Sequence, residues 1–355
     1  MVMGGLVRSA ARGLPPAYFA LVMATGINSI AMHRAGHDSL SATLLAIGTL
    51  AFLVLAALTV VRAARFRAEL TGDLTNPRKL FGAFTLVAGV DVLAGRFAIG
   101  GAPRLAAALL AIGILAWLVF GYATPAIILV KRSEGPVLGA VDGTWFIAVV
   151  ATQSVALGAT ALEPSWPAAE RAIALVSVML WSLGVVLYLS MATVLLVRLL
   201  LVEIGPDTIT PPYWIVMGAT AITVYAGARL LESPTTPVLA ATRPVLSGLS
   251  VLLWAFGTWI IPLLVAFGVW RHLILHVPLR YEPALWSICF PLGMYSVASS
   301  ELGHSAELPL VAAIGAGWAW VALVAWVVVF VSMVVSLVRE ARQVRVGALS
   351  QAVAR

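Results

Sequence analysis

The amino-acid sequence predicts an all-α integral membrane protein, with ten transmembrane helices forming five tandem helical hairpins around a central pore. Three observations support this prediction: an apolar composition, apolar stretches that recur along the chain, and a helix-start pattern in every second stretch. Hydrophobic residues make up 61% of the 355 residues and charged residues only 10%. An ordinary soluble domain has roughly a quarter of its residues charged. This chain cannot cover a water-facing surface, so we expect it in a lipid bilayer.

Ten apolar stretches are each long enough to cross a hydrocarbon core roughly 30 Å thick. We expect these spans at residues 15–33, 40–63, 78–98, 105–130, 142–161, 170–198, 211–231, 245–270, 283–303 and 310–337. They define a membrane domain at 15–337 between two tails, 1–14 and 338–355. The first span follows two arginines, as the core of a signal peptide would. Because nine spans follow it and no A-x-A cleavage site stands out, we expect it to be retained.

The basic residues predict how the chain is oriented in the membrane. Most of the 22 Lys and Arg residues lie in loops on one side, and six lie on the other: Arg34, Arg96, Arg104, Arg171, Arg229 and Arg243. Basic loops face the cytoplasm, so we expect a multi-pass plasma-membrane protein with both termini cytoplasmic. The net charge of +7 is spread over helix ends rather than gathered in one patch. We therefore expect no nucleic-acid partner.

The odd-numbered spans share a pattern at their beginnings. Each opens with residues suited to a helix start: Pro15-Pro16, Pro77, Asp142-Gly143, Pro211-Pro212 and Pro283. An aromatic residue follows in each span (Phe19, Phe84, Phe146, Trp214 and Trp286), and threonine recurs six positions later in three of them (Thr25, Thr152 and Thr220). Parallel repeats of this kind predict a ring whose inner wall is the odd-numbered set. The alternative is that small residues there only allow close helix packing.

The ninth span places Phe290, Pro291 and Gly293 near the middle of the membrane. Pro291 has no N–H to donate and Gly293 tolerates a bend, so we expect a helix kink at these residues. In the repeat alignment Phe290 lies level with four residues that would form the rest of a pore neck: Met23, Ala88, Val150 and Gly218. A phenylalanine in such a neck would gate the pore by excluding water or changing rotamer. An ordinary buried phenylalanine is the alternative.

Two segments resemble a known family. Phe19-ALVMATGINSIA in the first span and Trp286-SICFPLGMYSVA in the ninth are similar to the tellurite-resistance/C4-dicarboxylate transporter family. This family includes the plant slow-type anion channels and the fungal malate and sulfite carriers. The resemblance implies five inner helices around a pore, five outer helices, and a homotrimer with a pore in each subunit. It also implies a gating phenylalanine in the ninth helix, which by the local F-P pattern is Phe290.

Helix ends and charges predict that small inorganic or organic anions pass through the pore. Each inner helix would bring a partial charge of roughly +0.5 to the cytoplasmic mouth. At the opposite ends, Arg34, Arg96 and Arg229 either form a basic vestibule or extend to the membrane interface.

Asp91 is the one carboxylate well inside an odd-numbered span, where acidic residues are costly and are candidates for function. It either couples protons or forms a structural ion pair with Arg96 or Arg229. Proton coupling would favour the alternative to a channel, a secondary carrier for C4-dicarboxylates such as malate, or for sulfite.

The sequence offers no cluster of polar side chains at one depth, so we expect no enzymatic activity, no catalytic residue and no cofactor. The pairs His33/His37 and His272/His276 have the i,i+4 spacing of metal ligands on a helix. They lie at opposite ends of the predicted membrane domain and no adjacent carboxylate completes either site, so we expect no metal site. Which anion is transported, and whether by a channel or a carrier, stays open at this point.

Overall fold

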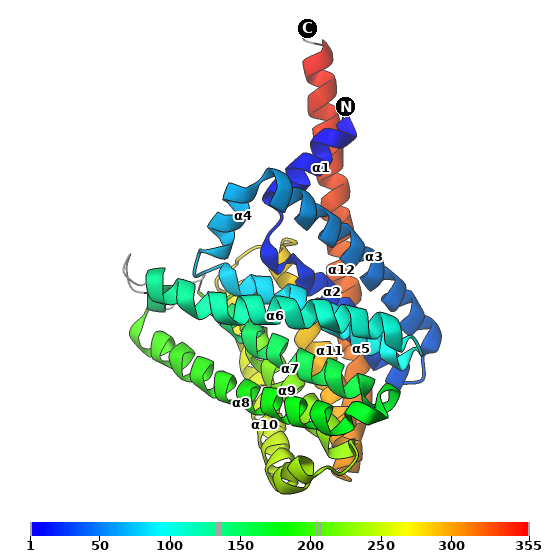
Figure 1. Ribbon diagram of the computed structural model, residues 1–355. Helices are drawn as coiled ribbons and strands as arrows, with labels where there is room; N and C mark the ends of the chain where they lie inside the picture. Colours follow the sequence, from blue (N-terminus) through cyan, green and yellow to red (C-terminus); the bar gives the residue numbers. More distant parts are fainter. Residues whose placement is uncertain (1, 132–136, 204, 206–207, 354–355) are drawn as a thin grey trace.

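The computed structural model describes residues 2–131, 137–203, 205 and 208–353. Over these residues the chain is helical, without a β-strand. Short and long helices alternate along most of it (Figure 1). The short ones are α2 (Ala20–Arg34), α5 (Phe84–Ile99), α7 (Ile147–Leu162), α9 (Trp214–Glu232) and α11 (Trp286–Ser305). The long ones are α3 (Asp38–Arg65), α6 (Pro103–Lys131), α8 (Glu170–Leu201), α10 (Pro237–Val269) and α12 (Pro309–Val353).

The five short helices form a closed ring. Each contacts two others, in the order α2, α5, α7, α9, α11 and back to α2. Most residues of these helices are buried, whereas the long helices expose large apolar side chains such as Leu50, Leu115 and Val324. An apolar surface of this extent is typical of a protein that contacts lipid. We refer to the short helices as the inner helices and to the long ones as the outer helices.

A short 3₁₀ turn precedes each inner helix, at Pro16–Phe19, Leu80–Ala83, Gly143–Phe146, Pro211–Tyr213 and Pro283–Leu285. The five turns contact one another in the same circular order as the helices. The inner helices therefore begin at one end of the bundle and run parallel. The aromatic residues aligned from the sequence lie at these turn-to-helix junctions.

Proline supplies a preset φ angle in three of the turns. In a fourth turn the carboxylate of Asp142 accepts a 2.8 Å hydrogen bond from the backbone N–H of Thr144. Gly143 follows, and a Cβ there would lie 2.0 Å from the carbonyl oxygen of Pro212, so only glycine permits this contact between turns.

Among the described residues, eight helical segments are long and apolar enough to cross a membrane: Asp38–Arg65, Leu80–Ile99, Pro103–Lys131, Gly143–Ser165, Pro167–Leu201, Pro211–Glu232, Pro237–Ile274 and Pro309–Gln343. The predicted spans 15–33 and 283–303, which correspond to α2 and α11, are not among these eight. Buried polar residues account for the difference, since α2 contains Thr25 and Asn28 and α11 contains Ser299 and Glu301. Within a ring, such groups face protein rather than lipid. The arrangement of ten spans thus stays a prediction.

Tryptophans of the outer helices donate hydrogen bonds to the inner helices. An indole N–H of one hairpin's outer helix donates to the next hairpin's inner helix in four cases: Trp117 to Thr152 Oγ1 at 2.9 Å, Trp181 to the carbonyl oxygen of Thr223 at 3.0 Å, Trp254 to Ser299 Oγ at 2.9 Å, and Trp326 to Thr25 Oγ1 at 2.9 Å. The last of these connects α12 to α2 and so joins the end of the chain to its beginning. Two of the recurring threonines, Thr25 and Thr152, are acceptors in this pattern.

Glycines on the outer helices lie against polar side chains of the inner helix in the same hairpin. Gly113 of α6 faces Asp91, Gly184 of α8 faces Gln153, and Gly257 of α10 faces Thr220. A Cβ at any of these glycines would lie 2.5 Å or less from the polar side chain. Small residues therefore bring the two helices of a hairpin close together, as is common in membrane proteins.

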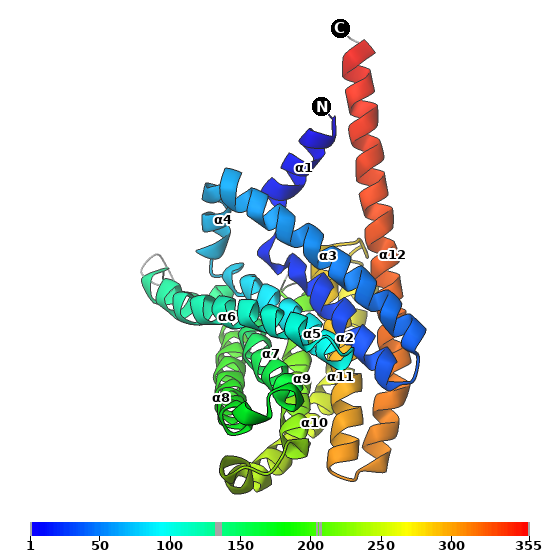
Figure 2. The ribbon, with the colours of Figure 1, turned by 45° about the vertical axis from the view of Figure 1, so that its right-hand side comes forward.

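Most of the described residues in both tails are helical. The first is mostly α1 (Val2–Gly13), and α12 continues through the second to Val353. Both project from the same end of the bundle, where the N- and C-termini lie near each other (Figure 2). The helix α4 (Arg67–Leu74) follows α3.

Arg62 joins α3, α4 and the first tail at this end of the bundle. It donates to the carbonyl oxygen of Leu14 and forms a 2.7 Å ion pair with Asp73, which also contacts Lys79 at 2.8 Å. Burial raises the pKa of Asp73, but the hydrogen bonds and charges of Lys79 and Arg62 outweigh it, so this pKa lies below the ordinary value.

Candidate functional site: an apolar neck and a polar chamber

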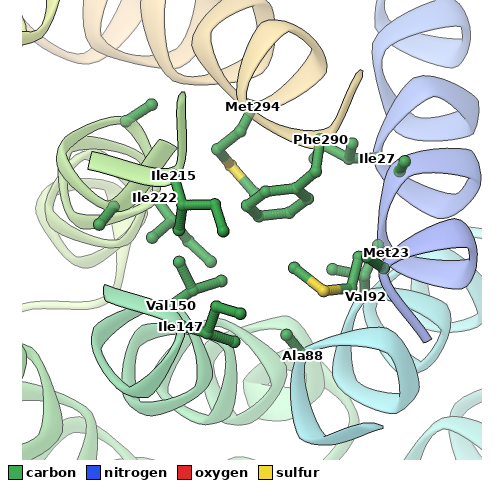
Figure 3. Close-up of a cluster of buried hydrophobic side chains, with 14 of the residues drawn as sticks. Met23, Ile27, Ala88, Val92, Ile147, Val150, Ile215, Ile222, Phe290 and Met294 are labelled. Carbon is green, nitrogen blue, oxygen red and sulfur yellow. The ribbon is translucent and has the colours of Figure 1, made fainter. Parts of the chain in front are cut away.

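The middle of the inner ring is filled by apolar side chains from all five inner helices (Figure 3). Figure 3 labels two residues from each helix: Met23 and Ile27 of α2, Ala88 and Val92 of α5, Ile147 and Val150 of α7, Ile215 and Ile222 of α9, and Phe290 and Met294 of α11. All ten are buried. We call this set the apolar neck. Met23, Ala88, Val150 and Phe290, which the sequence aligned at one level, all belong to it.

Gly218, the remaining residue of the predicted neck, faces a neighbouring helix. A Cβ on Gly218 would lie 2.8 Å from Cγ of Pro291, so its open side is filled by the proline ring of α11. Helix α9 instead reaches the neck with Ile215 and Ile222 (Figure 3). Gly218 thus allows α9 and α11 to approach closely, a role that sequence alignment by level cannot separate from pore lining.

Pro291 and Gly293 lie within one continuous helix, since α11 runs from Trp286 to Ser305. Gly293 faces α2, where its Cβ would lie 2.9 Å from Cγ2 of Ile27. Phe290 therefore stands on a helix fitted closely to both of its neighbours in the ring. The predicted kink at these residues stays a prediction.

A cavity of about 300 Å³ adjoins the neck, towards the C-terminal ends of the inner helices. Ile27, Val92 and Met294 belong to both the neck and the lining of this cavity. The other lining residues include six polar or charged ones: Arg34, Asp91, Ser154, Ser165, Tyr225 and Arg229. We call this cavity the chamber.

Two of the three predicted vestibule arginines meet in the chamber. Arg34 of α2 and Arg229 of α9 both bind the carboxylate of Glu301, which comes from α11. Arg229 also contacts Glu232 at 2.7 Å, and the guanidinium of Arg34 lies over the ring of Tyr225 at 5.7 Å. Three inner helices thus bring two positive groups and one buried negative group together.

Arg96, the third predicted vestibule arginine, lies elsewhere. It donates to Ser29 Oγ at 3.1 Å and to Ser41 Oγ at 2.9 Å, which joins α5 to the first hairpin. Arg96 is 7% exposed and does not belong to the chamber lining. The register explains this, because Arg96 points towards α2 and α3 while Arg34 and Arg229 point towards the ring interior.

Asp91 lines the chamber and is 2% exposed. Its Oδ2 accepts a 3.1 Å hydrogen bond from Ser154, and its Oδ1 has no hydrogen-bond partner among the described residues. The expected ion pair with Arg96 or Arg229 is not formed in the described part of the chain. Arg96 is instead bound by serines and Arg229 by glutamates, so a buried carboxyl without a cationic partner remains in the chamber.

Residues 13–334 match the family described as voltage-dependent anion channel. The chain belongs to this family. Two uncharacterized membrane proteins of Mycobacterium tuberculosis, from strains CDC 1551 / Oshkosh and H37Rv, are each 50% identical to it over 147 residues. That alignment covers 41% of this chain and 75% of each relative. The family match agrees with the resemblance noted in the first and ninth spans.

The sequence analysis did not identify Glu301 and Tyr225 as parts of the site. Glu301 is 267 residues from Arg34 and 72 from Arg229, so no local motif connects them. The available signal was the parallel ring itself, because the C-terminal residues of α2, α9 and α11 then lie at one level. Searching that level for opposite charges would have paired the glutamate with the arginines.

Proposed function

We propose that the protein passes small anions across the plasma membrane through the inner ring of each subunit, with Phe290 as the gate. The observation that carries this proposal is the closed ring of inner helices, whose apolar neck contains Phe290 and adjoins a chamber with Arg34 and Arg229. Membership of an anion-channel family supports the same class of substrate. Transport of this kind needs no catalytic residue and no cofactor.

The physical basis is a barrier between two attractive regions. The parallel inner helices direct five N-terminal ends, each with a partial positive charge, to one end of the ring. The chamber arginines attract anions at the other end. The neck between them offers an anion no polar group in place of its hydration water, so a side chain that fills it excludes water and ions alike.

The membrane arrangement follows from the same proposal. All ten predicted spans cross the bilayer, including α2 and α11, whose polar residues face the ring. Both termini lie in the cytoplasm, as the distribution of basic residues favours. The exposed apolar faces of the outer helices contact lipid and the other two subunits of a homotrimer, the assembly that the family resemblance implies.

Asp91 favours a second candidate function, a proton-coupled carrier for C4-dicarboxylates or sulfite. A buried carboxyl that has one hydrogen bond and no cationic partner in the described part of the chain can take up a proton as the anion passes. Its place in the chamber lining would connect its protonation to anion movement.

Reconstitution into lipid vesicles and planar bilayers tests both candidates. A channel should give currents that reverse near the anion equilibrium potential in a salt gradient, and uptake that does not require a pH gradient. Uptake that follows the pH gradient without measurable current would favour the carrier. Reversal near the cation equilibrium potential would overturn the anion proposal itself.

A further inference from the structure

The chamber contains two arginines that share one carboxylate. Oε1 of Glu301 accepts hydrogen bonds from Arg34 at 3.1 Å and from Arg229 at 3.0 Å, and its Oε2 pairs with Arg34 as well. The glutamate side chain is 2% exposed, whereas those of the arginines are 29% and 31% exposed. Glu301 therefore lies behind the arginines, and the arginines face the cavity, whose lining includes them but not Glu301.

Each arginine keeps donors for a second acceptor. A guanidinium carries five N–H groups in a planar fork. The contacts of Arg34 with Glu301, and of Arg229 with Glu301 and Glu232, use only some of these groups. The hydroxyl of Tyr225 lies 3.5 Å from Arg34 and adds a further polar group to the same wall of the chamber. Glu301 itself demonstrates that two oxygens on one carbon fit between the two forks, the arrangement that makes arginine–carboxylate pairs strong.

We propose that the chamber is a binding site for small carboxylates, held by Arg34 and Arg229, and that Glu301 weakens this site by competing for the same guanidinium groups. This proposal rests on the proposed function, because it gives the permeating anion a defined stop beside the neck. A carboxylate engages both forks with two oxygens, whereas a chloride ion meets them with a single atom. The site should therefore bind acetate more tightly than chloride.

The test measures binding to the purified full-length protein without any measurement of transport. Thermal unfolding is followed in sodium acetate or sodium chloride at constant ionic strength, because a ligand of the folded state raises the unfolding temperature by mass action. Wild-type protein should be half-saturated at a lower acetate than chloride concentration. Glu301→Gln should lower the half-saturating acetate concentration about tenfold, the equivalent of one charge-assisted hydrogen bond.

Two further variants serve as the control and the decisive comparison. Glu307→Gln removes an exposed acid beyond the end of α11 that is not part of the chamber lining, and should change the half-saturating acetate concentration less than about twofold. Arg34→Lys keeps the charge but loses the fork, and should abolish the preference for acetate over chloride. The preference compares acetate with chloride binding in the same protein. The Arg34→Lys comparison therefore tests the carboxylate site even if Glu301→Gln does not fold.

Equal binding of acetate and chloride by the wild type would overturn the proposal, and so would an acetate preference that survives Arg34→Lys. An increase in the half-saturating acetate concentration in folded Glu301→Gln would overturn the competing role of Glu301. A protein that conducts anions without this preference contradicts only the carboxylate site. A protein that shows the preference but conducts no anion contradicts only the proposed function.

Discussion

The neck and the chamber adjoin each other along the same five helices, yet they are built from opposite chemistry. The neck is a set of buried apolar side chains around Phe290. The chamber wall includes Arg34 and Arg229, which bind Glu301 at the ends of the inner helices, and Asp91 in the middle of α5. A charged group in a membrane protein is stable where a second helix supplies its partner or water reaches it. The chamber arginines meet this condition. The neck residues carry no charge and therefore need no such partner.

This difference separates the height of the barrier from the choice of ion. In the proposed function, a side chain in the neck determines whether water and ions pass. A charge in the chamber determines which ions collect beside the neck, because it acts through the local potential. Changes in the two regions should therefore have distinct signatures, and the following predictions use that distinction, from the largest expected effect to the smallest.

Removing the Phe290 ring should raise anion flux most. Phe290→Ala opens the neck to water, and we expect at least about a tenfold increase in anion efflux from vesicles, equivalent to a barrier lowered by 1.4 kcal/mol or more. Phe84→Ala is the matched control, because Phe84 lies at the start of α5 and stacks on Phe81 outside the neck. Equal, small effects of both substitutions would contradict the gate.

Filling the contact between α6 and the chamber carboxyl should destabilise the protein. A Cβ on Gly113 would lie 1.9 Å from Oδ1 of Asp91, so Gly113→Ala must displace a buried carboxyl. We expect a loss of about 1–3 kcal/mol in the free energy of unfolding, the range for overpacked sites. Gly121→Ala in the same helix has open space and should not destabilise. Equal thermal stability of the two variants would show that Asp91 is not held by α6.

Breaking the hydrogen bond that closes the ring should have a smaller effect. Trp326→Phe removes the 2.9 Å bond from α12 to Thr25, and we expect a cost of about 1 kcal/mol in thermal or denaturant unfolding. Trp320→Phe in the same helix is the control, because Trp320 is 46% exposed. If the two substitutions cost the same, the closing hydrogen bond contributes nothing specific.

The smallest expected effect is at the end of the bundle that carries the termini. The pKa of Asp73 is lowered in the folded protein, so its contribution is complete above the ordinary value of 3.8 and is lost as the pH falls through the lower folded value. Wild-type protein should lose about 0.5–1 kcal/mol more stability than Asp73→Asn below pH 4 or so. Parallel pH dependence of the two proteins would exclude a stabilising role for this ion pair.

The sequence was a good guide to the features that repeat along the chain. Aromatic residues such as Phe146 and Trp214, placed after helix-start signals, predicted where inner helices begin, because the start of a helix is encoded by adjacent residues. The same alignment brought Phe290 together with Met23, Ala88 and Val150, since parallel helices of equal rise keep their levels.

The directions of side chains around each helix were harder to predict. Gly218 has the correct level but faces Pro291, and Arg96 has a basic residue's usual place at a helix end but binds Ser29 and Ser41. Glu301 contacts arginines from two other hairpins, a result of ring closure that no local pattern contains. The level of a residue follows from its helix alone, whereas its partners follow from how neighbouring helices are rotated.

Current through Phe290→Ala protein in a planar bilayer with a salt gradient tests the central claim most directly. If the neck is the barrier and the positive groups on either side select the ion, conductance should rise while the reversal potential stays near the anion equilibrium value. A reversal potential that moves to zero would show that selectivity resides in the neck, and an unchanged conductance would show that Phe290 does not close the pore.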